Sequence, residues 1–398
     1  MPTFLYHRVD LYRTMGDRPA ELDSLAADLV GIETENPPGN ERACAEYIYE
    51  WFTERNIEAD LVREPDEDRP QVAATVGSGE PTLVLNGHID VVPAGDRGAW
   101  SRDPYSGDIE GGTLHGRGSA DMKTGVAVGM LAAADLAEEI ASGDLDGSLV
   151  VQAVMGEETA EPGTKTLLEQ GYNGDYGVVL EPTEMRTATS EKGLAWYEVT
   201  VEGEPSHASR PDQGSNAVLN AEPVLAALQD YDSRVREREH GLLGQAYATV
   251  TGFEAGTKEN VVPERATMVV DRRFLPDESA EAVDDEIAAL LAEVEDDHGV
   301  TTDWERTRTY ESAEVSADSR LAETLRAHST EAAGVPDEPW GVTASTDVRN
   351  FVNDAGIEAV TWGPGPLDQA HTIDEHTDLD EAATALTVLK RTARDLLG

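Results

Sequence analysis

The run Leu83-Val84-Leu85-Asn86-Gly87-His88-Ile89-Asp90-Val91-Val92 begins as an apolar segment and ends in a histidine and an aspartate two residues apart. A short apolar, β-branched run closed by glycine is typical of a buried strand in an α/β sheet. Ligands of open α/β sheets bind beyond the carboxyl ends of the strands, where we expect His88 and Asp90. Side chains at positions i and i+2 of an extended segment share a face, so the two can act together. Read alone, the pair also fits a polar strand end that caps a turn.

Two later apolar runs repeat this design. Residues 149–155 end in Gly156-Glu157-Glu158, and residues 176–180 end in Glu181. Between them and the first run, a glycine-rich turn that contains Asp121 leads into a helix predicted from Lys123 to Ile140. Because helices alternate with these strands, we predict an α/β fold with a mainly parallel sheet covered on both faces.

The pattern changes after Glu191. The segment up to residue 310 predicts the order β-α-β-β-α-β of a ferredoxin-like α+β sandwich. We therefore predict a small domain at residues 191–310, inserted into a larger one made of residues 1–190 and 311–398. Residues 1–20 show little periodicity and are expected to form a loose arm.

Acidic residues dominate the charge of this chain. It carries 79 Asp and Glu against 30 Lys and Arg, which gives a formal net charge of −49, and the acids are spread along its length. Self-repulsion of this size is screened at high ionic strength, so we expect a salt-adapted, halophilic protein. The alternative is an ordinary solvated acidic surface. No basic cluster is present, which argues against a nucleic-acid partner.

The single cysteine, Cys44, has no partner within the chain for a disulfide, and this favours a reducing compartment. The first twenty residues do not resemble a signal peptide. No run approaches the ~20 apolar residues that a membrane span needs. The sequence therefore predicts a soluble, cytoplasmic protein with no membrane partner.

The polar groups at the predicted strand ends include the imidazole of His88 and several carboxylates. A late motif adds a second imidazole, that of His371. Such a set suits borderline divalent ions such as zinc, with cobalt or manganese as alternatives. Carboxylates gathered at one sheet edge repel each other unless cations lie among them. One carboxylate shared between two ions ~3.5–4 Å apart would make a co-catalytic pair.

Five dispersed motifs resemble, in order, the signature of a zinc amidohydrolase family that includes acetylornithine deacetylase, succinyl-diaminopimelate desuccinylase and carboxypeptidase G. The resemblance covers roughly residues 21–398. It implies a dizinc catalytic domain with an inserted lid domain that dimerises. The motifs are His88-Ile89-Asp90-Val91-Val92-Pro93, Gly116-Arg117-Gly118-Ser119-Ala120-Asp121-Met122-Lys123, Glu157-Glu158, Glu181-Pro182-Thr183 and Ala370-His371.

The resemblance implies a role for each matched residue of the catalytic domain. Asp90 would accept a hydrogen bond from the far ring nitrogen of His88 and so fix its tautomer. Glu157 would be the general base that takes a proton from the attacking water. The implied metal ligands are His88 and Glu181 on one ion, Glu158 and His371 on the other, and Asp121 between them.

The segment Glu204-Pro205-Ser206-His207-Ala208-Ser209-Arg210-Pro211 resembles the lid histidine motif of the family. His207 would donate to the oxyanion. In the family this histidine reaches into the site of the partner subunit, so a homodimer is implied. Without the surrounding motif, His207 would read as an ordinary loop histidine.

Further positions match substrate contacts of the family. Asn260 and Arg273 match lid positions that bind a substrate carboxylate, which a planar guanidinium can hold through two hydrogen bonds. Arg272 is the competing candidate, because strand alternation places it on the opposite face. Thr346 and the loop that begins at Gly363 resemble substrate contacts with lower specificity.

The remaining histidines are expected to lie outside the metal shell, because a lone histidine is more often a surface or packing residue. His115 stands where the family often has an aromatic residue, and His376 lies beside the late metal motif. The others are His7, His240, His298 and His328.

The sequence thus predicts a metal-dependent hydrolase of amino-acid metabolism that acts on linear amides. Deacylation of an N-acyl amino acid, of the acetylornithine or succinyl-diaminopimelate type, is our first interpretation. A dipeptidase or glutamate-releasing carboxypeptidase on the same site is the alternative. A metal-binding regulatory homologue that does not turn over is a third hypothesis. The acyl group and the native metal are left open, since loops and metal availability decide them.

Overall fold

The computed structural model describes residues 18–398, so most of the expected N-terminal arm lies outside the described residues. The chain divides into two compact units. Unit 1 comprises the described residues up to Thr189 together with Val315–Trp340 and Thr346–Gly398. Unit 2 comprises Ser190–Glu314 and Gly341–Ser345.

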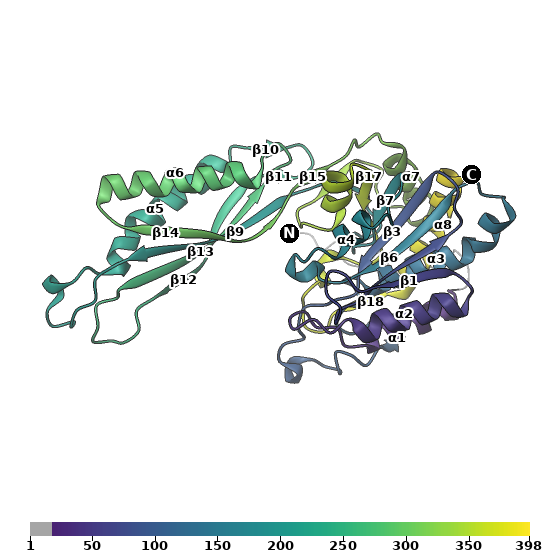
Figure 1. Ribbon diagram of the computed structural model, residues 1–398, viewed down its shortest axis with the longest axis horizontal. Helices are drawn as coiled ribbons and strands as arrows, with labels where there is room; N and C mark the ends of the chain where they lie inside the picture. The colour runs from purple at the N-terminus through teal and green to yellow at the C-terminus, as the bar shows by residue number, and fades with distance from the viewer. Residues whose placement is uncertain (1–17) are drawn as a thin grey trace. The chain divides into compact units, whose positions relative to one another are not determined.

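The sheet of unit 1 is parallel at its centre and antiparallel at its edges (Figure 1). The neighbouring pairs β6·β3, β3·β7 and β7·β17 are parallel, whereas β1·β2, β2·β6 and β17·β8 are antiparallel. Short strands β15 and β16 also pair with β8, and β15 and the β8 residues that it pairs with belong to unit 2. The strands are β1 (Glu58–Val62), β2 (Gln71–Val76), β3 (Thr82–His88), β6 (Ser148–Val154), β7 (Tyr176–Val179), β8 (Ala188–Glu191), β15 (Ala313–Glu314), β16 (Trp340–Val342) and β17 (Glu358–Thr361).

Connection length explains this mixture. A helical crossover joins β3 to β6 and another joins β6 to β7, as parallel neighbours require. Only a short loop separates β1 from β2, and a loop of that length joins antiparallel neighbours. The predicted α/β fold class is confirmed, with antiparallel edges added to its parallel centre.

Helices cover both faces of this sheet. Alternate residues of β6 point to opposite faces. Leu149 and Val151 belong to the main apolar core, whereas Val154 packs in a small cluster with Leu167 of α4. The main core also contains residues of the other five helices. The helices are α1 (Ala20–Gly31), α2 (Arg42–Glu54), α3 (Lys123–Ser142), α4 (Gly163–Glu169), α7 (Arg320–Ala333) and α8 (Leu379–Leu397).

The close approach of α3 to the sheet depends on Gly125. A Cβ atom at Gly125 would lie 2.2 Å from the carbonyl oxygen of Leu180, the residue before Glu181. Glycine therefore allows the first turn of α3 to pack directly on the end of β7.

A separate three-stranded sheet in unit 1 was not predicted. It consists of β4 (Asp108–Glu110), β5 (Thr113–His115) and β18 (His376–Asp378), in the order β18-β5-β4. Strands of three residues are too short to show a period-2 pattern, so the sequence gives little sign of them.

Unit 2 is a four-stranded antiparallel sheet covered by two helices (Figure 1). Its strand order, β12-β13-β9-β14, is that of the predicted ferredoxin-like sandwich. Tyr197 and Val199 of β9 are fully buried in its core. A small hairpin, β10 (Glu239–His240) with β11 (Gly244–Gln245), completes the unit. The main elements are β9 (Gly193–Glu202), α5 (Ala217–Val235), β12 (Tyr247–Ala255), β13 (Arg265–Phe274), α6 (Ala280–His298) and β14 (Thr302–Tyr310).

Among the described residues, no helix combines the length and the apolar composition needed to cross a membrane.

Candidate metal centre

Three of the predicted metal ligands lie at the carboxyl ends of neighbouring parallel strands. His88 is the last residue of β3, Glu158 follows β6 in a short 3-10 turn, and Glu181 follows β7. These strands lie side by side in the order β6-β3-β7 (Figure 1), so their carboxyl ends place the three residues at one edge of the sheet. Asp121 comes from the turn before α3, and His371 from the loop before β18.

Asp121 lies between the two histidines. Its Oδ1 is 3.0 Å from Nε2 of His88, and its Oδ2 is 3.4 Å from Nε2 of His371. His88 Nε2 is also 3.7 Å from Glu181 Oε1, and His371 Nε2 is 3.0 Å from Glu158 Oε2. The five side chains thus fall into two pairs that share one aspartate.

Asp90 contacts His88 differently from the expectation. Nδ1 of His88 lies 2.8 Å from the backbone oxygen of Asp90, and the carboxylate is farther away, at 3.6 Å. The carboxylate instead accepts from the backbone N–H groups of Glu157 and Glu158, at 3.3 and 3.2 Å, and from the side chain of Asn36. A carbonyl oxygen only accepts, so Nδ1 carries a proton and Nε2 is the ring nitrogen that faces Asp121. Asp90 therefore fixes the His88 tautomer through its main chain, while its carboxylate holds the turn that carries the two glutamates.

Glu157 lies against two charged residues that the sequence analysis did not single out. Its Oε1 is 3.8 Å from the Arg349 guanidinium, which is also 3.2 Å from Asp347. Burial raises the pKa of Glu157 well above its ordinary value, and Asp347 and Glu158 add to this effect, whereas His88 and Arg349 oppose it. Asp347 directly follows Thr346 and Arg349 lies two residues further on, but nothing in their spacing indicates contact with residue 157.

Glu375 was also missed, and it joins the two loops that carry Asp121 and His371. Its carboxylate accepts from the backbone N–H groups of Ala120 and Asp121, at 2.9 and 3.1 Å, and pairs with Arg117 at 2.6 Å. The side chain of Glu375 is fully buried. It lies four residues after His371, so one side chain fixes the position of Asp121 relative to the His371 loop.

The charge of this cluster fits a bound cation. Burial raises the pKa of Glu181 well above its ordinary value, and the nearby Asp121 carboxylate adds to the rise. Burial by itself would lower the pKa of His88, yet Asp121, Glu181 and Asp90 raise it overall. Bonds to Asp121 and Glu158 raise the pKa of His371 to about 10. The excess of buried negative charge thus favours protonation of these side chains, and a bound divalent ion can take the place of the protons.

Donor atoms of His88, Asp121 and Glu158 all lie within 4.8 Å of one another. Within the described part of the chain, no other group of three or more such side chains is as close. Imidazole and carboxylate donors together suit zinc, manganese or cobalt.

The two predicted substrate contacts of unit 1 are both buried. Thr346 Oγ1 lies 3.0 Å from the hydroxyl of Thr361. At Gly363, a Cβ atom would lie 2.6 Å from the carbonyl oxygen of Glu181. Gly363 therefore permits the close approach of its loop to Glu181, a packing role that its resemblance to a substrate contact did not indicate.

His207 and Asn260 lie together on an exposed end of unit 2. The backbone N–H of Ala208 donates to the Asn260 carbonyl at 3.0 Å, and His207 pairs with Val261 in an isolated bridge. Nδ1 of His207 accepts from the backbone N–H of Ser209 at 3.1 Å, so in the neutral ring the proton is on Nε2.

Arg272 and Arg273 point to opposite faces of β13. Arg272 is fully buried, where it pairs with Glu278 and donates to the Tyr231 hydroxyl at 3.0 Å. Arg273 is partly exposed and pairs with Asp271 at 2.8 Å. Of the two, only Arg273 lies where solvent can reach its guanidinium.

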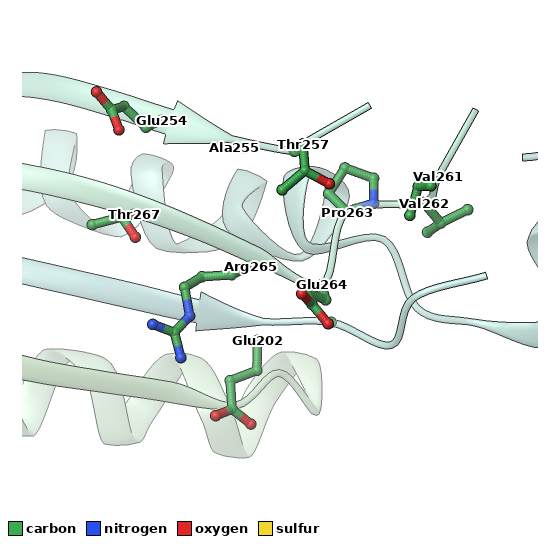
Figure 2. Close-up of a pocket in the computed structure, with 12 residues that line it drawn as sticks. Glu202, Glu254, Ala255, Thr257, Val261, Val262, Pro263, Glu264, Arg265 and Thr267 are labelled. Atoms are coloured by element: carbon green, nitrogen blue, oxygen red, sulfur yellow. The ribbon is translucent and has the colours of Figure 1, made fainter. Parts of the chain in front are cut away.

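A pocket of about 660 Å³ opens at the ends of β12 and β13 in unit 2, and it is strongly acidic (Figure 2). Glu202, Glu254 and Glu264 line it beside Arg265. Its lining includes Val261, which pairs with His207. The pocket therefore lies beside the segment that carries His207 and Asn260.

The protein-family model described as peptidase family M20/M25/M40 matches residues 84–395. The succinyl-diaminopimelate desuccinylase of Stenotrophomonas maltophilia is 30% identical over 338 residues, covering 81% of this chain and 86% of that protein. The M20 family metallo-carboxypeptidase Sso-CP2 of Sulfolobus solfataricus matches with a TM-score of 0.79 at 19% identity, over 94% of this chain and 99% of that one. The Bacillus subtilis YXEP protein, a dinuclear metal binding peptidase of the M20 family, matches with a TM-score of 0.68 at 18% identity, over 94% and 97%. The two structures share the fold of this chain over nearly its whole length.

Proposed function

The chain belongs to peptidase family M20/M25/M40, and we propose that it cleaves the amide bond of an N-acyl amino acid. The family resemblance in the sequence is thereby confirmed. With its desuccinylase relative, the family makes the chain a metal-dependent hydrolase of small amides or peptides. Within this class our first choice is a deacylase of the acetylornithine or succinyl-diaminopimelate type, because the Stenotrophomonas relative bears the latter name.

The observation that carries the proposal is the position of Asp121 between two histidine–glutamate pairs. An aspartate with one oxygen toward each pair suits two divalent ions, of which zinc is our first choice and cobalt or manganese are alternatives. His88 and Glu181 would hold one ion, and Glu158 and His371 the other. The Bacillus subtilis neighbour is described as dinuclear, which agrees with this count.

The bound ions would supply Lewis-acid polarisation of the scissile carbonyl and lower the pKa of water. Glu157 would take the proton of the attacking water and deliver it to the departing amine. The Glu157 side chain is 11% exposed, so Oε1 is largely shielded from bulk water while an attacking water can still reach it. The Asp90 carboxylate holds the backbone of Glu157 and Glu158 in one orientation, and adjacent side chains diverge, so one can ligate while the other moves a proton.

We propose that unit 2 completes the site of a partner subunit in a homodimer. His207 would donate to the developing oxyanion, and its Nε2–H is the group that remains available for this. Asn260 on the same exposed end and the partly exposed guanidinium of Arg273 would bind the substrate carboxylate. The boundaries of unit 2, close to the predicted 191–310, support its role as an inserted lid.

The net charge of −49 supports a salt-adapted protein, with an acidic surface that needs a high ionic strength for full stability. Assays therefore belong in molar KCl.

The experiment is a substrate panel for the protein loaded with Zn²⁺, Co²⁺ or Mn²⁺. It compares N-acetylornithine and N-succinyl-diaminopimelate with other N-acyl amino acids, dipeptides and glutamate-terminated peptides. We expect the highest kcat/KM for an N-acyl amino acid. A preference for dipeptides or for peptides ending in glutamate would replace the deacylase with the peptidase alternative, which the description of the Sulfolobus neighbour as a carboxypeptidase makes the second candidate.

A further inference from the structure

Two histidines and an aspartate form a row across the three-stranded sheet of unit 1. His115 of β5 lies directly opposite His376 of β18, and Asp108 of β4 lies opposite His115 on its other side. Side chains of directly opposite residues project from the same face of a sheet. This row is distinct from the five side chains of the proposed dizinc centre.

The two imidazole rings have a spacing that suits one shared ion. Their centroids are 5.7 Å apart and their planes are inclined at 34°. Two imidazoles bound to one tetrahedral ion through nitrogens about 2.0–2.1 Å away have centroids roughly 5–6 Å apart. The backbone pairing of β5 and β18 already provides this separation.

A backbone carbonyl orients the His376 ring. Its Nδ1 lies 2.9 Å from the backbone oxygen of Asp374. A carbonyl oxygen only accepts, so Nδ1 carries a proton, and in the neutral ring the lone pair is on Nε2. This bond, from the far ring nitrogen to a carbonyl, is the usual way in which proteins orient a metal-binding histidine.

The surroundings of His115 favour its neutral form. Partial burial lowers its pKa, and the charges of Arg102 and His376 lower it further, whereas Glu110 and Asp108 oppose them. Arg102 pairs with Glu110, so its charge is partly offset. A neutral imidazole is the form that binds a metal ion.

We propose that His115 and His376 form an additional binding position for a borderline divalent ion such as Ni²⁺, Cu²⁺ or Zn²⁺. Within the described residues no third donor completes a compact group here, so water fills the remaining positions. Asp108, opposite His115 on β4, is the one carboxylate of this row. With two protein ligands the ion binds more weakly than in a site with three or four.

An ion at this position would join the segments that lead to the dizinc centre. β5 runs into the turn that carries Asp121, and β18 follows Glu375, whose carboxylate binds the Asp121 backbone. Cross-linking β5 to β18 therefore stabilises the relative placement of Asp121 and His371. The expected consequence is thermal stabilisation by the ion, since it binds the folded chain only.

The test counts Ni²⁺ ions bound to chelator-treated protein by equilibrium dialysis in molar KCl. Excess Mg²⁺ is included to occupy surface carboxylates, which prefer it, while imidazole prefers Ni²⁺. We expect His376→Gln and His115→Phe each to bind one Ni²⁺ fewer per chain than wild type, and the double variant to lose no more than either single one. His115→Phe keeps an aromatic ring in the sheet, and His376 is exposed, so both variants should fold.

His328→Gln is the matched control, because this histidine pairs with Asp395 at 2.8 Å on the surface and should leave the count unchanged. Equal Ni²⁺ counts and affinities for wild type and both variants would overturn the proposal. Because the test compares the Ni²⁺ counts of variants and wild type, its outcome does not depend on how many ions the dizinc centre binds or on which substrate is cleaved.

Discussion

The two units hold most of their proposed functional residues in opposite ways, and His371 of unit 1, whose side chain is 55% exposed, is the exception. In unit 1, His88 is 2% exposed and Asp121 7%, and partners from several strand ends fix both. In unit 2, His207 and Asn260 are exposed and are held by bonds within their own two segments. Buried charges need a compensating partner to be tolerated, so unit 1 by itself indicates a cation. The exposed residues of unit 2 carry no such requirement, and their function depends on what docks against them.

The largest expected effect comes from Glu157→Gln in unit 1. The change keeps the size of the side chain and removes its capacity to accept the proton, so we expect kcat to fall about 10²–10⁴-fold. Metal content, measured by atomic absorption, should match wild type because Glu157 is not a proposed ligand. A variant that keeps both its metal and wild-type kcat would remove Glu157 from the role of base.

His207→Ala tests the opposite unit, and we expect kcat to fall about 10²–10³-fold, the usual loss for one oxyanion donor. If His207 acts in the site of the partner subunit, mixing His207→Ala with Glu157→Gln and allowing subunits to exchange restores activity. The mixed dimer contains one site with both residues intact. A mixture no more active than its components, although exchange is shown by mass spectrometry, contradicts action across the dimer.

A smaller effect is expected from Glu375→Gln, which touches no substrate. The amide weakens both the pairing with Arg117 and the hydrogen bond that the side chain accepts from the Asp121 backbone N–H. Metal affinity should therefore fall roughly 10–100-fold. Competition with a chromophoric chelator measures this affinity. The matched control is Glu278→Gln, which alters a buried arginine–glutamate pair of unit 2. Equal losses of affinity in both variants would point to general destabilisation instead of ligand positioning.

The smallest effect concerns salt. Lowering KCl from molar to tenth-molar should reduce the melting temperature, because repulsion among surface acids is then less screened. The buried centre of unit 1 is screened much less, so its metal affinity should change less than that of the proposed His115–His376 position on the surface. Calorimetry and dialysis at several KCl concentrations provide both measurements. A melting temperature independent of salt would contradict halophilic adaptation.

Strand-end motifs made much of the fold and the set of candidate ligands predictable from sequence. The run at Leu83 to Val92 indicated both a buried strand and a polar edge, and the alternation after Glu191 indicated the ferredoxin-like order. Both signals are local periodicities, which a single sequence preserves.

The rest depends on contacts between distant segments. Glu375 meets Asp121 across more than two hundred residues and Arg349 meets Glu157 across nearly two hundred, so neither contact leaves a local pattern. The family resemblance implies that the Asp90 carboxylate binds the His88 ring, and the i, i+2 spacing on one strand allows such a contact. In the structure it binds a turn that follows another strand.

The most direct test of the central claim is X-ray anomalous scattering at the zinc edge from crystals of the zinc-loaded protein. The account predicts two peaks roughly 3.5–4 Å apart with Asp121 between them. One should lie by His88 and Glu181, and the other by Glu158 and His371. A single peak in this cluster, or a pair of peaks that does not share Asp121, would contradict the proposed dizinc centre.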